Sequence, residues 1–157
     1  MNVGNISNLL KRVSDNTGRL MMLALLSAVP VQEVLAGASC VVAKRLGHSL
    51  AIEWVASPQE SAESALRKAE GKLIEQGYRT KGQDVHAQAA TELPNGYMVI
   101  IKTEYTTATG RTRTSYGCGY SARSENQAGQ AALYDLQNYS WGWKPEYGYE
   151  VVESFRY

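Results

Sequence analysis

The first 38 residues constrain this chain most, because their pattern is that of a segment removed during export. Three basic residues lie within the first 19 positions, an apolar run covers residues 20–31, and Ala36-Gly37-Ala38 provides three small side chains. A basic start, an apolar stretch of about 7–15 residues and a small-x-small site together form a secretory signal peptide. We therefore expect a signal peptide over residues 1–38, cleavage after Ala38, and a single domain over residues 39–157 in a periplasmic or secreted protein.

Three alternatives to a cleaved leader stay open. The segment could be retained as a membrane anchor, or it could form a buried N-terminal helix. Its apolar run contains Pro30 and is shorter than the roughly 20 residues of a membrane-spanning helix, so cleavage is favoured. Cys40 could instead be lipidated, although Gly37 stands where a bacterial lipoprotein signal usually has Leu. We expect membrane contact only through an uncleaved leader or a lipid on Cys40.

The charge balance argues against a nucleic-acid partner. The whole chain has 16 Lys plus Arg, 15 Asp plus Glu and a net charge of +1. The expected leader holds three basic and two acidic residues, so the remaining residues 39–157 carry no net charge. Affinity for a polyanion depends largely on clustered Lys and Arg side chains. We therefore expect no nucleic-acid partner.

The two cysteines, Cys40 and Cys118, lie 78 positions apart after the expected leader. Exported proteins meet an oxidising environment, so we predict a Cys40–Cys118 disulfide; two unpaired thiols are the alternative. The cysteines, His48 and His86 show no ligand-pair spacing for a metal, and Cys118 has no His or acid close by in the sequence. The sequence thus predicts no metal and no cofactor.

Alternating and periodic segments predict an α+β fold. We expect a two-layer sandwich, in which two helices cover one face of a mainly antiparallel sheet of about five strands. The predicted strands cover residues 48–56, 84–93, 97–107, 111–120 and 147–155, and the predicted helices cover residues 58–76 and 125–138.

Local signals set the expected helix starts and turns. Ser57 with Glu60, and Ser124 with Gln127, have the spacing of capping boxes. Asn95-Gly96 predicts one hairpin, and the turn ending at Gly110 predicts a second. Aligning the two helices by these expected caps gives too little identity to establish a duplication, although each half could be a strand–helix unit.

The strongest candidate binding residues are four aromatic residues near the C-terminus: Trp141, Trp143, Tyr147 and Tyr149. Exposed aromatic rings stack on sugars or anchor a protein partner, because they bury a large area with few torsions to fix. The alternative is that these rings pack in the core and across strands. A second group, in which Arg111 and Arg113 share one strand face, could bind phosphates but is also typical of a solvated strand.

Enzymatic motifs are absent from the sequence. It contains no Gly-x-Ser-x-Gly elbow, no Gly-rich phosphate loop and no His-Glu-x-x-His. We expect a small exported binding protein without catalytic residues, inhibitor- or immunity-like in build, that contacts a protein or an envelope glycan. One alternative is an envelope hydrolase that uses His48 or His86 with a Ser or a carboxylate. The other is a surface or membrane-anchored structural protein. The sequence does not indicate an oligomeric state.

Overall fold

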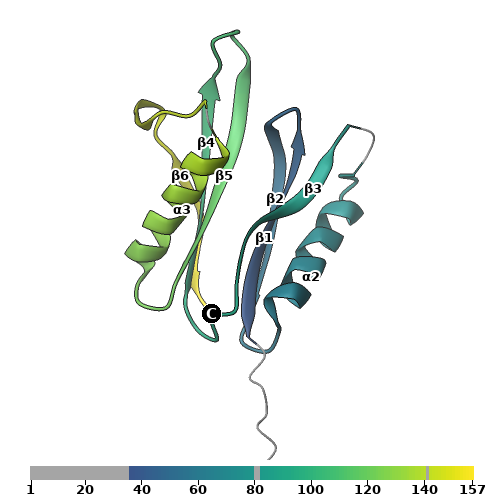
Figure 1. The fold of residues 1–157 in the computed structure, drawn as a ribbon, viewed down its shortest axis with the longest axis vertical. Coiled ribbons are helices and arrows are strands. Elements are labelled where there is room, and N and C mark those ends of the chain that lie inside the picture. Colours follow the sequence, from purple (N-terminus) through teal and green to yellow (C-terminus); the bar gives the residue numbers. More distant parts are fainter. Residues whose placement is uncertain (1–35, 80–81, 141) are drawn as a thin grey trace, which may run out of the picture. The chain divides into compact units, whose positions relative to one another are not determined.

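The computed structural model describes residues 36–79, 82–140 and 142–157. The expected leader therefore lies outside the described residues except for its last three positions, and Trp141 lies outside them too. In chain order (Figure 1), the elements are β1 (Gly37–Arg45), β2 (His48–Ser57), α2 (Ala62–Glu75), β3 (Asp84–Thr91), β4 (Tyr97–Thr106), β5 (Thr112–Ser121), α3 (Glu125–Tyr139), the short 3-10 helix η2 (Pro145–Tyr147) and β6 (Glu150–Arg156).

The domain consists of two halves with the same connectivity. In the first half, the β1–β2 hairpin leads into α2, and β3 returns to pair with β1; in the second, the β4–β5 hairpin leads into α3, and β6 returns to pair with β4. The sheet orders are β2-β1-β3 and β5-β4-β6, with antiparallel pairing throughout. The structure is therefore a tandem ββαβ repeat.

The register supports this repeat at the level of single residues. The pairing of β1 with β3 is interrupted between Cys40 and Val41, and that of β4 with β6 between Ile100 and Ile101. In both cases the irregularity follows the fourth residue of the central strand. A bulge re-aims one edge of a sheet, so the same bulge in both halves gives β3 and β6 equivalent paths.

The two helices are also equivalent. Ser61 caps α2 by accepting a hydrogen bond from the Ser64 amide, and Ser124 caps α3 by accepting one from the Gln127 amide. At equal spacing from these caps, each helix buries an Ala, a second Ala and a Leu. These residues are Ala65, Ala69 and Leu73 in α2, and Ala128, Ala132 and Leu136 in α3.

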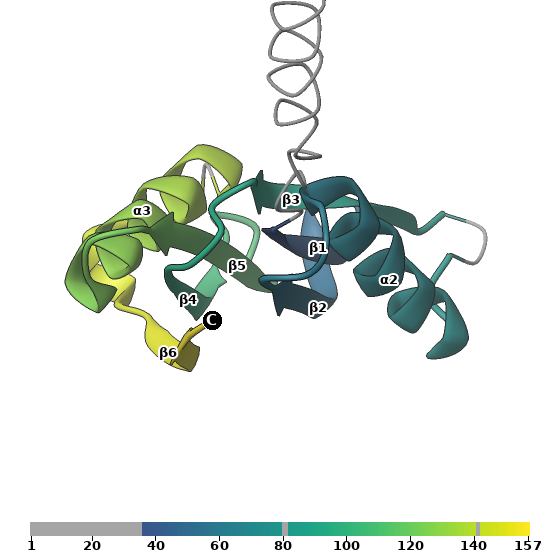
Figure 2. The same cartoon turned by 90° about the horizontal axis from the view of Figure 1, so that it is seen from below.

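The core has three layers of apolar contacts, which place the two sheets face to face between the helices. Ala38, Cys40, Met98, Ile100 and Cys118 form the cluster between the sheets. A second cluster joins the outer face of the first sheet to α2, and a third joins the outer face of the second sheet to α3. Figures 1 and 2 show the helices on opposite sides of the paired sheets.

The α+β class with two helices and antiparallel strands is confirmed. The structure differs from the expected two-layer sandwich because six strands form two sheets and the helices cover opposite faces. The added strand is β1, whose buried small and apolar residues show no alternation because both of its faces are covered. Since β3 pairs with β1, the Asn95-Gly96 turn joins the two sheets and the hairpin expected there is wrong.

The expected start of the first helix is also wrong. Ser57 pairs with Gly37 at the end of β2, and its hydroxyl oxygen accepts the Gln59 amide at 3.1 Å. The helix begins one turn later, after Ser61. Strand pairing holds Ser57 in extended backbone, so the capping box expected from Ser57 and Glu60 does not form.

The expected cleavage position falls inside the first strand. Gly37 and Ala38 belong to β1, and Ala38 is fully buried opposite Ala56 and Thr91. Residues 1–35 lie outside the described part, so the structure does not test the leader itself. A cut before Ala36 would leave β1 whole.

Candidate functional site

Of the four predicted aromatic residues, the structure describes Trp143, Tyr147 and Tyr149, which have different surroundings. Trp143 is half-buried, packs against the cluster beneath α3 and donates its indole N–H to the Gly148 carbonyl at 3.0 Å. Tyr147 and Tyr149 are 39% and 51% exposed. Tyr149 lines a groove between α3 and β6, and Tyr147 lines another groove near the β4–β5 turn. Both also line a smaller pocket of about 440 Å³ beside Lys102 and Glu104. Trp143 thus serves packing in this fold, and the two tyrosines remain available to a ligand.

The groove beside Tyr149, called here the α3–β6 groove, has a volume of about 650 Å³. Its size lies within the range of about 300–1,000 Å³ found for small-molecule sites. The residues that matter for its chemistry are Tyr97, Asn126, Gly129, Leu133, Tyr149 and Val151.

Gly129 opens this groove. A Cβ atom added at Gly129 would meet no heavy atom within 4 Å, so the space beside the helix is empty there. Counting from the helix caps, the equivalent residue in the first half is Leu66. Leu66 is half-buried and packs with Val85 of β3 against the cluster beneath α2. The second half therefore has an open groove at the position that a leucine fills in the first half.

The walls of the α3–β6 groove combine apolar and uncharged polar groups. Tyr97, Leu133 and the 58%-exposed Val151 give it apolar area, and the amides of Asn126 and Gln130 can both donate and accept hydrogen bonds. Glu125 also lines the groove, and its carboxylate accepts a hydrogen bond from the Ser154 hydroxyl. No Lys, Arg or His is found among the described residues that line it. The groove thus suits an uncharged ligand with hydroxyl or amide groups.

Sequence reasoning found Tyr149 but missed Tyr97, Gly129 and the α3 side chains. The available signal was the repeat: aligning Ser61 with Ser124 places Gly129 opposite Leu66. The expected cap at Ser57 shifted that alignment by one helical turn and hid the difference.

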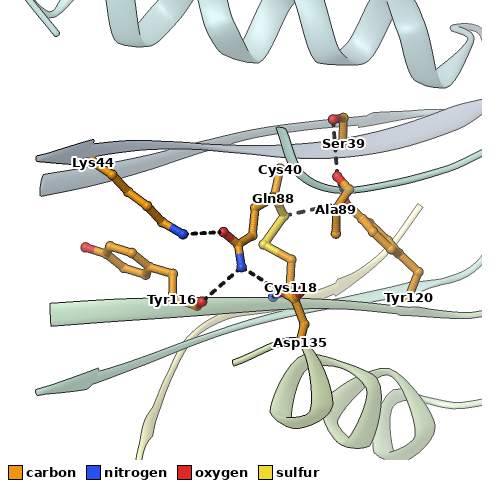
Figure 3. Close-up of a disulfide and its surroundings, with 9 residues drawn as sticks. All are labelled: Ser39, Cys40, Lys44, Gln88, Ala89, Tyr116, Cys118, Tyr120 and Asp135. Carbon is orange, nitrogen blue, oxygen red and sulfur yellow. Dashed lines mark hydrogen bonds between the residues drawn. A yellow bond between two sulfur atoms is a disulfide. The ribbon is translucent and has the colours of Figure 1, made fainter. Parts of the chain in front are cut away.

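The predicted disulfide is present. Cys40 of β1 and Cys118 of β5 are bonded, and both residues are buried in the cluster between the sheets (Figure 3). The bond therefore joins the two halves of the repeat. Because the Cys40 sulfur is bonded to Cys118, it is not available for the lipid considered as an alternative.

Beside the disulfide, two side chains close the free edge of β5. Asp135 of α3 accepts the Cys118 amide hydrogen at 2.8 Å, and Gln88 of β3 donates to the Tyr116 carbonyl at 3.4 Å. Gln88 also donates to Asp135 at 3.0 Å and accepts from Lys44 at 3.1 Å (Figure 3). These side chains take the place of a neighbouring strand, which protects an edge that could otherwise pair with another chain.

Burial is the largest influence on the pKa values of Asp135 and Lys44. It raises the pKa of Asp135 above its ordinary value of 3.8, although the hydrogen bonds from Cys118 and Gln88 act in the opposite direction. Burial likewise lowers the pKa of Lys44, whose ammonium lies 4.9 Å from the centre of the Tyr139 ring. Burial thus disfavours the charged forms of both groups, while their hydrogen bonds join side chains of β1, β3 and α3.

The raised pKa of Asp135 predicts a pH dependence. The native state binds this proton more tightly than the unfolded state does, so the wild type loses stability as pH rises from about 4 through the native pKa. Asp135→Asn keeps an oxygen for the Cys118 amide and cannot ionise. We expect its melting temperature to rise relative to the wild type between about pH 4 and pH 7. Thermal unfolding of both proteins across this range measures the effect, and a constant difference would contradict it.

The two histidines do not form a catalytic pair with a nucleophile in the described residues. The His48 Nδ1 atom accepts the Thr114 amide hydrogen at 2.9 Å, which joins β2 to β5. His86 is largely exposed on β3, and partial desolvation of its ring, together with the nearby Lys44 charge, lowers its pKa. No hydrogen bond joins either imidazole to a Ser, Cys or carboxylate side chain in the part of the chain that the structure describes. The hydrolase hypothesis remains a prediction.

Comparison of this chain with protein-family models, with curated proteins and with solved structures finds no match. Among the described helices, none has the length and apolar character needed to cross a membrane. The proposed function below is therefore based on the geometry of the grooves.

Proposed function

We propose that this chain is an exported binding protein without catalytic residues, and that its α3–β6 groove holds an uncharged glycan of the cell envelope. The observation that carries the proposal is the opening of this groove by Gly129 where the equivalent half has Leu66. The first half shows that a leucine at this position fills the space between helix and sheet. Since packing alone does not require the opening at Gly129, the opening favours a ligand there.

The chemistry of the groove fits a sugar. Tyr149, which is 51% exposed, offers a ring on which the C–H face of a sugar can stack, and the amides of Asn126 and Gln130 offer donors and acceptors for hydroxyl and acetamido groups. Among the described lining residues the Glu125 carboxylate is the one charged group, which disfavours an anionic ligand. The Arg156 guanidinium does not line the groove and lies 5.7 Å from the centre of the Tyr97 ring. The disulfide supports the compartment, since such bonds persist in oxidising environments.

Isothermal titration with the tetramer of β-1,4-linked N-acetylglucosamine tests this proposal. Gly129→Leu rebuilds the filled arrangement of the first half, so we expect it to weaken binding about tenfold or more because the side chain occupies the groove. The fold should survive, since the new Cβ meets open space and Leu favours helix over Gly.

Gly71→Leu is the matched control. Gly71 lies in α2, and a Cβ added there also meets no heavy atom within 4 Å, but the residue lines none of the grooves described. We expect wild-type affinity from this variant. If the wild type does not bind the tetramer, or if both variants bind it equally well, the proposed function is wrong.

A further inference from the structure

A second groove, called here the hairpin groove, lies where the β1–β2 turn, the β4–β5 hairpin and the loop after α3 meet. It has a volume of about 770 Å³. The residues that determine its chemistry are Leu46, Tyr105, Thr107, Arg113, Lys144 and Tyr147. These residues come from both halves of the repeat.

The charge of the hairpin groove is opposite to that of the α3–β6 groove. Arg113 and Lys144 both line it, and no Asp or Glu is found among its described lining residues. In the described part of the chain no carboxylate lies within 4.0 Å of the Arg113 guanidinium, while Lys144 pairs with Glu146 at 3.5 Å. Both partners of that pair are about two-thirds exposed, and such pairs contribute little. Both cations can therefore turn to an anionic ligand.

The arginine stands beside an aromatic surface. Arg113 is the direct partner of Tyr105 in the β4–β5 pairing, so the two side chains share one face of the sheet. The centres of the Tyr105 and Tyr147 rings are 5.9 Å apart. A Cβ at Gly142 would lie 2.7 Å from the Tyr105 ring, so the loop after α3 holds this ring closely in place. Tyr105 is only 7% exposed and so supports the neighbouring Tyr147 ring, which is 39% exposed and is the ring that a ligand can reach. A guanidinium near an accessible ring is suited to a ligand with an acidic substituent.

Leu46 adds an unusual feature at the edge of this groove. It occupies the β1–β2 turn with a φ of 52°, a conformation that usually selects Gly, Asn or Asp. It is also 82% exposed. A leucine that is both strained and exposed has no role in the core, and Leu46 adds apolar area to the edge of this groove.

We propose that the hairpin groove binds a sugar that carries a carboxylate, with Arg113 and Lys144 holding the acid and Tyr147, supported by the buried Tyr105, contacting the sugar ring. Arginine binds a carboxylate through two parallel hydrogen bonds, which fixes the orientation of the sugar. This proposal does not depend on the α3–β6 groove, because the two sites share none of these residues.

N-acetylmuramic acid and N-acetylglucosamine are suitable probes, because they differ only by the lactyl group that bears the carboxylate. We expect calorimetry at low salt to show binding of the acidic sugar about tenfold tighter than that of the neutral sugar. Arg113→Gln and the more exposed Lys144→Gln should each remove most of this preference. Gly129→Leu should leave it unchanged, which separates this site from the proposed glycan groove.

Arg111→Gln is the matched control, since it removes the same charge two residues away, just before β5 begins, but Arg111 does not line the groove. It should change affinity less than about twofold. If Arg111→Gln and Arg113→Gln lower the affinity for N-acetylmuramic acid equally, the preference comes from the overall charge of the protein, and the proposal is overturned. Equal binding of the two sugars would overturn it as well, as would tighter binding of N-acetylglucosamine 6-phosphate, which has a phosphate on O6 and no lactyl carboxylate on O3.

Discussion

Gly119→Ala should destabilise the fold by about 3 kcal/mol or more, because the side of β5 that carries Gly119 lies directly against α3. A Cβ at this position would lie 2.0 Å from the Ala128 carbonyl oxygen and 2.2 Å from the Ala132 nitrogen. Both are backbone atoms of the helix, so no side chain can rotate away to make room. The helix must move off the sheet, which opens the cluster formed by Val99, Ile101 and the buried face of α3.

Thermal and urea unfolding measure this effect, and we expect the melting temperature to fall by about 10 °C or more. Gly129→Ala is the control in the same half, since its added Cβ meets open space and Ala favours helix by about 0.5–1 kcal/mol over Gly. We expect that variant to be at least as stable as the wild type. A Gly119→Ala protein that unfolds within about 1 kcal/mol of the wild type would show that α3 does not pack this closely.

Replacing Cys40 and Cys118 together by Ala should cost about 4 kcal/mol of unfolding free energy. The bond closes a loop with a sequence separation of 78, and a cross-link over a loop of that order lowers the entropy of the unfolded chain by an amount worth about 4–5 kcal/mol. It also cross-links the two halves in addition to the backbone that joins β3 to β4, so its loss removes one restraint on their separation in partly unfolded states. The cluster between the sheets keeps its other members, Ala38, Met98 and Ile100.

Urea unfolding of the double variant and of the oxidised wild type measures this loss. The double alanine variant leaves no free thiol, so mispairing does not complicate the comparison. We expect a lower midpoint for the variant, together with a larger dependence on denaturant because its unfolded chain is less restricted. A loss below about 1 kcal/mol would mean that the disulfide adds little to contacts already present between the sheets.

Local patterns in the sequence predicted most elements of this fold. Ser124 with Gln127 predicted a helix over residues 125–138, and α3 covers Glu125–Tyr139. The alternation in residues 97–107 predicted β4, whose two faces pack in different clusters. These features are local, because a cap or an alternating strand depends on residues a few positions apart.

The division into two sheets could not be predicted in the same way. It depends on the pairing of β3 with β1, between residues about 50 positions apart, for which the sequence has no local signal. The missed strand β1 is buried on both faces, and its first residues also fit a peptidase site. Small residues such as Gly37 and Ala38 satisfy both interpretations, so the sequence alone favoured the leader.

The candidate site was predicted in part for a related reason. Aromatic density near the C-terminus drew attention to Tyr147 and Tyr149, and both are exposed in grooves. Trp143 is also aromatic, but it packs on the α3 cluster and donates its indole N–H to Gly148. The sequence alone does not indicate these contacts. The significance of Gly129 required the comparison of two halves, which only the correct helix starts provide.

Amide chemical shifts measured during titration with the N-acetylglucosamine tetramer test the glycan groove most directly. The account predicts shifts that saturate and cluster on Gly129, Leu133, Tyr149 and Val151, with no shifts at Leu66 and Val85 in the filled half. Shifts confined to the first half, or no saturable shifts in a folded wild-type protein, would contradict it.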